Sequence, residues 1–127
     1  MTHNYFNSIA DQRVKNQFIK GSGLTSAHEV VKMMGAIQAQ DFNMARWALG
    51  IRSRNLTLEK INKDIDEGKI IRIHLLRPTW QFVSPEDVYW LLDLSATSIV
   101  RALRYRDKEL GLTSSIFNKC NYTIENG

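Results

Sequence analysis

Two glutamines separated by one residue, Gln38 and Gln40, follow an apolar helical stretch and are followed directly by Asp41. In a helix, residues i and i+2 point about 200° apart, since each residue turns the chain by about 100°. In extended backbone, the same two residues point the same way. Gly35 weakens a helix just before the pair. We therefore expect Gln38 and Gln40 at or beyond the end of that helix, with both side chains on one face.

An amide is too weak a base to remove a proton near neutral pH, but its carbonyl orients water and its NH2 group donates to a leaving base. Such chemistry is sufficient only where the bond is already labile. A cationic N-alkylated purine is such a case, because it leaves without first being protonated. Asp41 is placed to accept the proton of the attacking water, or to cap a helix ahead of Asn43. Gln38 and Gln40 have their own alternative, which is to solvate a helix end.

The elements that position these residues can be read from the periodicity. Ser26-x-x-Glu29 is a capping box that begins a helix over 26–36. Further helices are expected over 43–53, capped by Asn43, and over 57–67, capped by Thr57 and ended by Gly68. The residues expected to face the core of the 43–53 helix are Met44, Trp47, Ala48 and Ile51. An earlier helix face is formed by Phe6, Ala10, Val14 and Phe18.

Residues 70–83 change to a period of two, which predicts two short antiparallel strands with Arg77-Pro78 near their turn. Ser84-Pro85 then begins a helix, a separate helix is expected over 97–109, and a last one includes Ile116 and Ile124. The predicted fold class is mainly α (α+β): a winged helix, or helix-turn-helix, with one small hairpin wing followed by further helices. We expect a winged-helix unit with an N-terminal helix in 1–83. Residues 84–127 are expected to be a helical extension, the start of a second such unit left incomplete.

Composition narrows the function classes. The 127 residues fit one domain, and 17 Lys+Arg against 13 Asp+Glu give a net charge of +4, which favours a polyanionic partner. The single Cys120 excludes an internal disulfide, and His3, His28 and His74 lack the spacing of metal ligands. We expect no metal and no cofactor. The sequence has no signal peptide and no apolar run near the ~18 residues of a membrane span, so we expect a cytoplasmic protein without a membrane partner.

The expected DNA surface does not include the 57–67 helix. Its four carboxylates against two lysines give a charge of −2, which phosphate would repel. If the arginines line one surface, DNA lies against the hairpin and the 43–53 helix. The candidate DNA-binding residues are Arg46, Arg52, Arg54, Arg72, His74, Arg77 and Gln81. His74 is alternatively a partly exposed packing residue, and Trp47 and Trp80 are expected in the core rather than as platforms for bases.

Three segments together carry a family resemblance: 34–41 (MGAIQAQD), 48–54 (ALGIRSR) and 71–83 (IRIHLLRPTWQFV). They resemble the N-terminal part of the AlkZ/YcaQ-like family of bacterial winged-helix DNA glycosylases. The resemblance implies tandem winged-helix units that form a concave DNA-binding cradle and excise alkylated purines, including bulky adducts and crosslinks. It implies that Gln38 and Gln40 are the catalytic Gln-x-Gln and that 70–83 is a DNA-contacting wing. Pro78 and Gln81 stand where that family usually has Gly and His.

Three functions follow as hypotheses. The first is the N-terminal part of a glycosylase acting on alkylated or crosslinked double-stranded DNA, with Gln38, Gln40 and Asp41 as the catalytic residues. The second is a non-catalytic winged-helix regulator that binds DNA. The third is a winged-helix module that binds another protein. An abasic-site assay separates the first from the others, and a salt-dependent DNA titration separates the second from the third.

Overall fold

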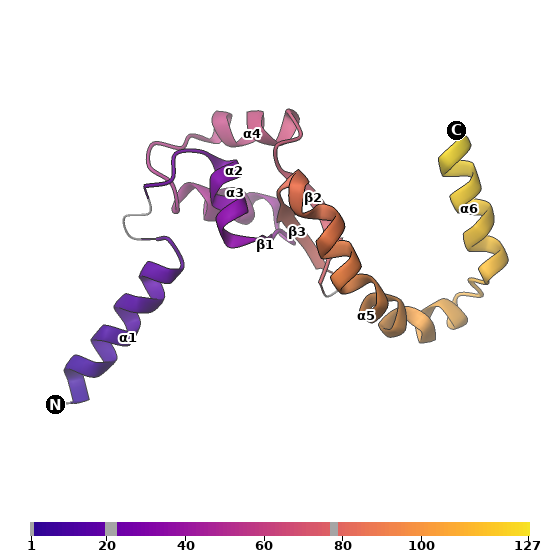
Figure 1. Cartoon of the computed structure of the whole chain (residues 1–127), viewed down its shortest axis with the longest axis horizontal. Coiled ribbons are helices and arrows are strands. Elements are labelled where there is room, and N and C mark those ends of the chain that lie inside the picture. Colours follow the sequence, from indigo (N-terminus) through magenta and orange to yellow (C-terminus); the bar gives the residue numbers. More distant parts are fainter. Residues whose placement is uncertain (1, 20–22, 77–78) are drawn as a thin grey trace.

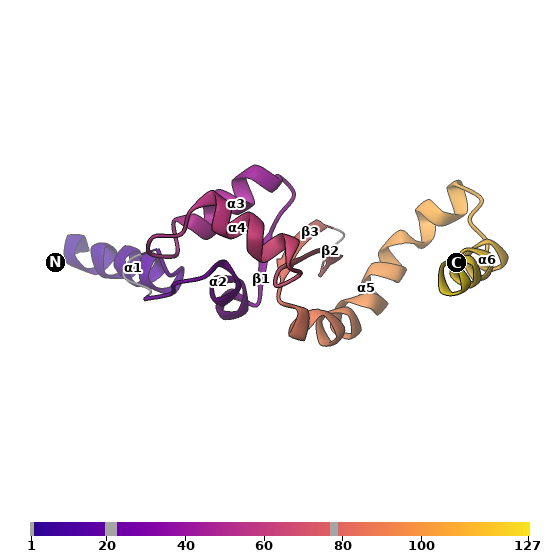
Figure 2. The same ribbon diagram turned by 90° about the horizontal axis from the view of Figure 1, so that it is seen from above.

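The computed structural model describes residues 2–19, 23–76 and 79–127, with side chains from residue 8 onward. The elements, in chain order, are α1 (Thr2–Asn16), α2 (Ala27–Met34), β1 (Ala36–Gln38), α3 (Phe42–Gly50), α4 (Leu58–Asp66), β2 (Ile71–Leu75), β3 (Thr79–Val83), the short 3-10 helix η1 (Pro85–Asp87), α5 (Val88–Glu109) and α6 (Ser114–Asn126). Figures 1 and 2 show α2, α3, α4 and the sheet gathered in the middle of the molecule.

The central part is a winged helix, as predicted, in the order α2-β1-α3-α4-β2-β3. Its antiparallel sheet has the strand order β1-β3-β2, so β3 is the middle strand and β1 is an edge. The prediction of a two-stranded hairpin was incomplete, because β1 adds a third strand. The helix α2 ends at Gly35, whose φ of 74° lies in the left-handed region that glycine adopts without strain, and β1 begins at the next residue.

One face of the sheet carries the main core. The ring of Phe82, in the middle strand, is fully buried and packs against the three helices α2, α3 and α4. The helical residues of this core include Ala27, Val30, Val31, Ala45, Leu49 and Ile61. The predicted caps of two of these helices are confirmed: Ser26 and Glu29 form the capping box of α2, and the Thr57 hydroxyl accepts a hydrogen bond from the N–H of Lys60 in α4.

The helix α3 differs from its prediction in two ways. It begins at Phe42 with Asp41 as its cap, so the assignment of Asn43 as the cap was wrong. Its buried residues are Ala45 and Leu49, while Met44 is 57% and Trp47 60% exposed, so placing Trp47 in the core was also wrong. Apolar residues cover two neighbouring faces of this helix, and periodicity alone did not distinguish the face that packs.

The other face of the sheet packs against α5. Leu75 and Val83 from the strands meet Leu91 of α5 in a second, smaller core. This helix runs unbroken over Val88–Glu109, so the separate helix predicted over 97–109 is the second half of α5. No glycine or proline interrupts this stretch, which is why the helix continues although only its first half is covered.

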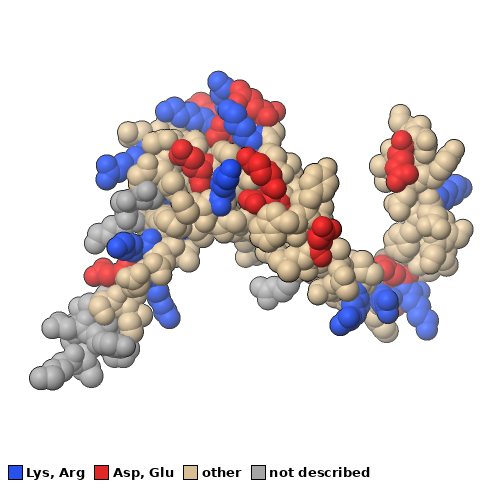
Figure 3. All heavy atoms as spheres, in the orientation of Figure 1, with Lys and Arg blue, Asp and Glu red and all other residues tan. Residues whose placement is uncertain are grey.

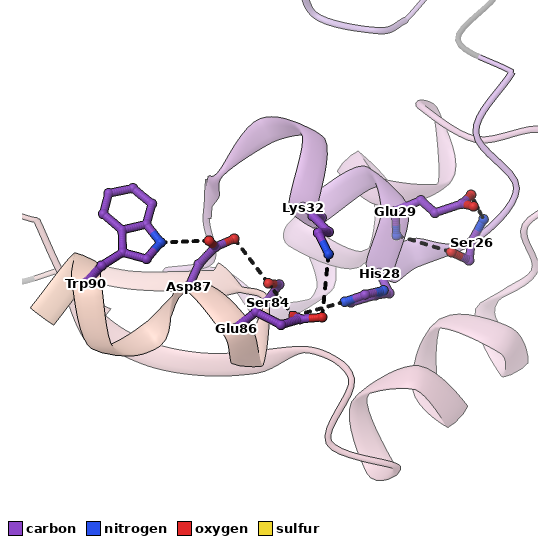
Figure 4. Close-up of polar contacts among 8 residues, drawn as sticks. All are labelled: Ser26, His28, Glu29, Lys32, Ser84, Glu86, Asp87 and Trp90. Carbon is purple, nitrogen blue, oxygen red and sulfur yellow. Dashed lines mark hydrogen bonds and ion pairs between the residues drawn. The ribbon is translucent and has the colours of Figure 1, made fainter.

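A polar junction links α2 to the segment that leads into α5, and Figure 4 shows it. The carboxylate of Glu86 lies 3.4 Å from His28 Nε2 and 3.6 Å from Lys32 Nζ, and it accepts a hydrogen bond of 2.6 Å from the Ser84 hydroxyl. These contacts, chiefly the Ser84 hydroxyl, lower the pKa of Glu86 from 4.5 to about 2. Ser84 therefore begins this segment as predicted, but its side chain bonds carboxylates rather than the backbone N–H groups of a helix.

The first and last helices lie away from the sheet. Both views show α1 and α6 projecting from opposite sides of the winged helix. Side chains 8–16 of α1 and all of those in α6 are exposed, including Phe117 and Ile124. Among the described residues, no helix combines the length and apolar character needed to cross a membrane.

Candidate functional site

Gln38 and Gln40 lie at the point where β1 leaves the sheet. Burial alternates along this segment: Ile37 is 8% and Ala39 0% exposed, whereas both glutamine side chains are exposed. The two glutamines line one open pocket of about 280 Å³ together with Asp41, Met44 and Ala45. The prediction that the pair lies beyond the helix, with both side chains on a common face, is confirmed.

The middle strand fixes this segment through Trp80. The Ala39 N–H donates to the Trp80 carbonyl at 2.8 Å, one residue after the last register pair of β1, Gln38 with Gln81. The Trp80 N–H in turn lies 3.4 Å from Gln40 Oε1, which accepts its hydrogen bond. Since that bond identifies the oxygen of the Gln40 amide, its NH2 group is the part left to donate elsewhere.

The amide of Gln38 is less constrained. Its side chain makes no hydrogen bond with any residue of the described ranges 2–19, 23–76 and 79–127. Both its carbonyl oxygen and its NH2 group are therefore available at the pocket. The two glutamines are chemically unequal here, with one carbonyl bound by backbone and one free.

Asp41 is the N-cap of α3. Its Oδ1 accepts a hydrogen bond of 3.0 Å from the N–H of Met44, so the helix-capping interpretation is confirmed. The cap uses one carboxylate oxygen, and Asp41 also lines the pocket of the two glutamines. The second oxygen makes no hydrogen bond within the described part of the chain.

Arg72 reaches this segment from β2, on the far side of the middle strand. Its Nε donates to the Ala39 carbonyl at 3.0 Å and its Nη2 to the Gln40 carbonyl at 3.3 Å. The guanidinium carbon lies 4.5 Å from the centre of the Trp80 ring and 5.7 Å from that of Phe42. Arg72 thus bonds the backbone that carries the glutamines and stacks on the aromatic residues around it.

Two further arginines of the expected DNA surface also have partners within the chain. Arg46 donates from Nη1 to Asn62 Oδ1 at 2.7 Å and from Nη2 to Asn43, and it lies over the Phe42 ring at 4.6 Å. Arg52 donates to the Ala48 carbonyl at 2.7 Å and to Gln17 at 3.3 Å. The side chain of Arg54 is exposed and has no such partner in the described ranges.

The remaining candidates lie on the hairpin. His74 is exposed, with its ring edge-on to Trp80 at 4.0 Å between centroids. Gln81 is 8% exposed in the middle strand, and its Nε2 donates to Thr79 Oγ1 at 2.9 Å. Arg77 and Pro78 lie outside the described residues.

Sequence reasoning missed four residues that shape the site: Phe42, Met44, Ala45 and Trp80. Met44 and Ala45 could have been found from the correct cap, because a cap at Asp41 places them in the first turn of α3 beside it. The contacts of Phe42 and Trp80 depend on how distant segments meet, and no local pattern reports that.

In the described part of the chain, the surroundings of the pocket offer no evident metal site and one larger groove. No group of three or more His, Cys, Asp or Glu side chains able to hold a metal occurs in the parts of the chain that the structure describes. A larger apolar groove of about 430 Å³ lies between α3 and α4, with Trp47, Ile51 and Leu58 among its lining residues. It shares no residue with the pocket of the glutamines.

Comparison with known proteins identifies a similar fold and a family. The solved DNA glycosylase AlkZ of Streptomyces sahachiroi superimposes with a TM-score of 0.61 at 24% identity, over 71% of this chain and 26% of that one. This chain therefore spans about a quarter of the solved protein's length. No curated relative matches the sequence. Residues 31–117, which include the glutamine pair, both arms of the hairpin and α5, match the family of AlkZ-like DNA glycosylases, and the chain belongs to that family.

Proposed function

We propose that this chain supplies the DNA-binding winged helix and the catalytic glutamines of an enzyme that hydrolyses the N-glycosidic bond of alkylated purines in duplex DNA. The observation that carries the proposal is the common pocket of Gln38 and Gln40, two exposed amides on otherwise buried extended backbone. Membership of the AlkZ-like family supports DNA as the substrate.

In this reaction, water attacks the anomeric carbon while the bond to the purine breaks. The bonding electrons pass to the purine, which neutralises its positive charge, so no general acid is required. The free carbonyl of Gln38 is suited to orient the attacking water, and the remaining NH2 group of Gln40 to donate to the substrate. An acceptor oxygen close to the sugar also stabilises the positive charge that develops there. The carboxylate oxygen of Asp41 that the helix cap leaves unused accepts the water's proton.

Single-turnover excision of an N7-alkylguanine from duplex DNA, read as abasic sites, tests the assignment. Gln38→Ala and Gln40→Ala should each slow excision by roughly 10- to 1000-fold, about 1.4–4 kcal/mol of barrier, with little change in DNA affinity. Gln12→Ala is the matched control, because Gln12 is an exposed amide on α1 that bonds only Asn16 among the described residues. Equal rates for the parent and both site variants would reject the catalytic role of the pair.

For the DNA surface, we propose the outer side of the hairpin, α3 and the turn after α3 that carries Arg52 and Arg54. The supporting observations are the exposed Arg54 and His74, with Arg77 predicted from the sequence at the hairpin turn. The guanidinium groups of Arg46, Arg52 and Arg72 have internal partners. Those of Arg46 and Arg72 keep further N–H donors with which to meet phosphate at the edge of this surface. Gln81 is buried and lies opposite Gln38 in the sheet, so it supports this surface from within the fold.

The two other hypotheses give different results in the same experiments. A non-catalytic DNA-binding protein would show salt-dependent affinity for duplex DNA without abasic sites. A module that binds protein alone would show neither.

A further inference from the structure

The segment that carries the glutamines leaves the sheet at its edge. Since β1 ends at Gln38, the carbonyl groups of Ala39 and Gln40 lie beyond the last register pair of this strand, Gln38 with Gln81. Backbone in this position is usually free to shift. Here both carbonyls have a donor, and it is the same side chain in each case, Arg72.

Arg72 spans the sheet to reach them. It sits on β2 opposite Phe82 of the middle strand, and its guanidinium meets two successive carbonyls at 3.0 and 3.3 Å on the other side of that strand. The planar fork of a guanidinium bonds two acceptors at once, and it stacks on aromatic faces. Trp80 and Phe42 supply those faces at 4.5 and 5.7 Å. A lysine has the same charge but neither the fork nor the flat surface.

The same segment is held at a second point by Trp80, which bonds the N–H of Ala39 and the side-chain oxygen of Gln40. The Trp80 ring, the Arg72 guanidinium and Gln40 therefore form one connected group of contacts. A shift of Arg72 would move the backbone of Gln40, the stacking on Trp80 and, through both, the amides in the pocket.

We infer that Arg72 is a positioning residue, which fixes the backbone of Ala39 and Gln40 so that the amides of Gln38 and Gln40 face one pocket, and which links the wing strand β2 to that pocket. The catalytic consequence rests on the proposed function, whereas the structural one does not. Positioning the backbone is a different role from the phosphate contact expected from the sequence. Replacing Arg72 with lysine should keep a phosphate contact but lose the positioning.

The first test needs no activity. In the free protein, the side-chain amide resonances of Gln38 and Gln40 and the indole resonance of Trp80 are compared between the parent, Arg72→Lys and Arg72→Met. Both variants should shift these signals, while backbone resonances of α2 and α4 stay in place and so show that the fold is kept. Arg54→Lys is the control and should shift none of them, because the side chain of Arg54 is exposed and has no partner in the described ranges.

The second test adds DNA. In single-turnover excision, Arg72→Lys should lose roughly 100-fold in rate, as expected for misplaced catalytic groups. Its dependence of affinity on salt should equal the parent's, because lysine still neutralises a phosphate. Arg72→Lys with the parent's excision rate, or unchanged Gln38, Gln40 and Trp80 signals in the first test, would overturn the inference. A parent that excises nothing, combined with shifted signals, would reject the proposed function and leave the positioning role of Arg72 established.

Discussion

Among the single residues of the site, Asp41 has two roles, one for each oxygen of its carboxylate. Its Oδ1 caps α3, and we propose that its other oxygen accepts a proton. These tasks can be separated, because asparagine caps a helix about as well as aspartate but does not accept a proton near neutral pH. Asp41→Asn should therefore keep the melting temperature of the parent and lose roughly 10²- to 10⁴-fold in excision rate.

The companion variant tests the cap alone. Asp41→Ala should lower the free energy of unfolding by about 0.5–2 kcal/mol, measured by urea denaturation, because it leaves the first turn of α3 without an acceptor. An Asp41→Asn variant as active as the parent would limit Asp41 to its structural task.

A second prediction at this scale concerns Glu86. Its pKa is lowered to about 2 in the folded protein from 4.5, because the Ser84 hydroxyl, the backbone N–H of Glu86 itself, His28 and Lys32 stabilise its ionised form. A carboxyl with a depressed pKa stabilises the fold fully above about pH 4.5 and loses that contribution as the pH falls towards 2. In Glu86→Gln, the loss of stability between these values should be smaller than in the parent.

Melting temperatures measured from pH 5 to pH 2.5 check this. Glu125→Gln is a suitable control, since Glu125 is exposed at the far end of α6. An acid profile of Glu86→Gln that follows the parent's would show that the junction in Figure 4 does not contribute to stability.

The sequence predicted contacts between residues close together in the chain, but not contacts between distant segments. The common face of Gln38 and Gln40 was predictable, because it depends on two residues and the dihedral angles between them. The contacts of Arg72 were not, because they join β2 to the end of β1 across another strand. The same holds for Arg46, whose partner Asn62 lies on another helix.

At the scale of elements, the caps and periods predicted most helices and the hairpin, because these signals are local. The boundary between β1 and α3 was less visible, since Asp41 and Asn43 are both good caps and a three-residue strand has almost no period. The packing face of α3 was predicted wrongly for a similar reason. Its apolar residues cover two faces, and only the tertiary structure shows that Ala45 and Leu49 are inside.

This difference in burial can be measured. Phe82→Ala removes a fully buried ring that joins the sheet to three helices, and it should lower the free energy of unfolding by about 3–5 kcal/mol. Trp47→Ala removes a larger side chain that is 60% exposed, and it should change stability by less than about 0.5 kcal/mol. Both free energies of unfolding can be measured by chemical denaturation. A larger loss for Trp47→Ala than for Phe82→Ala would contradict the burial described for these two residues.

At the scale of the whole molecule, charge is spread unevenly. On the face in Figure 3, acidic and basic side chains are mixed over α4, and basic side chains gather towards the end of α5. Close pairs lie at the end of α4 and in the turn after it, such as Lys69 with Glu67 at 2.6 Å and with Asp64 at 3.6 Å. A helix region with more carboxylates than lysines, in which Lys63 is already paired with Glu67, offers little to a phosphate backbone. This agrees with a DNA surface on another side of the winged helix.

The dependence of DNA affinity on salt can locate that surface. Each phosphate that a basic residue neutralises contributes about −0.9 to the slope of log affinity against log salt concentration. Replacing Arg54 and Arg77 together with alanine should therefore reduce the steepness of the slope by about 1.8 if both contact phosphate. Lys63→Ala should leave it unchanged, because Lys63 lies on α4 beside Glu67 at 3.7 Å. Titration of a fluorescent duplex at several salt concentrations decides the matter. A slope that falls with Lys63→Ala and not with the arginine pair would place the DNA on α4 and contradict the proposed surface.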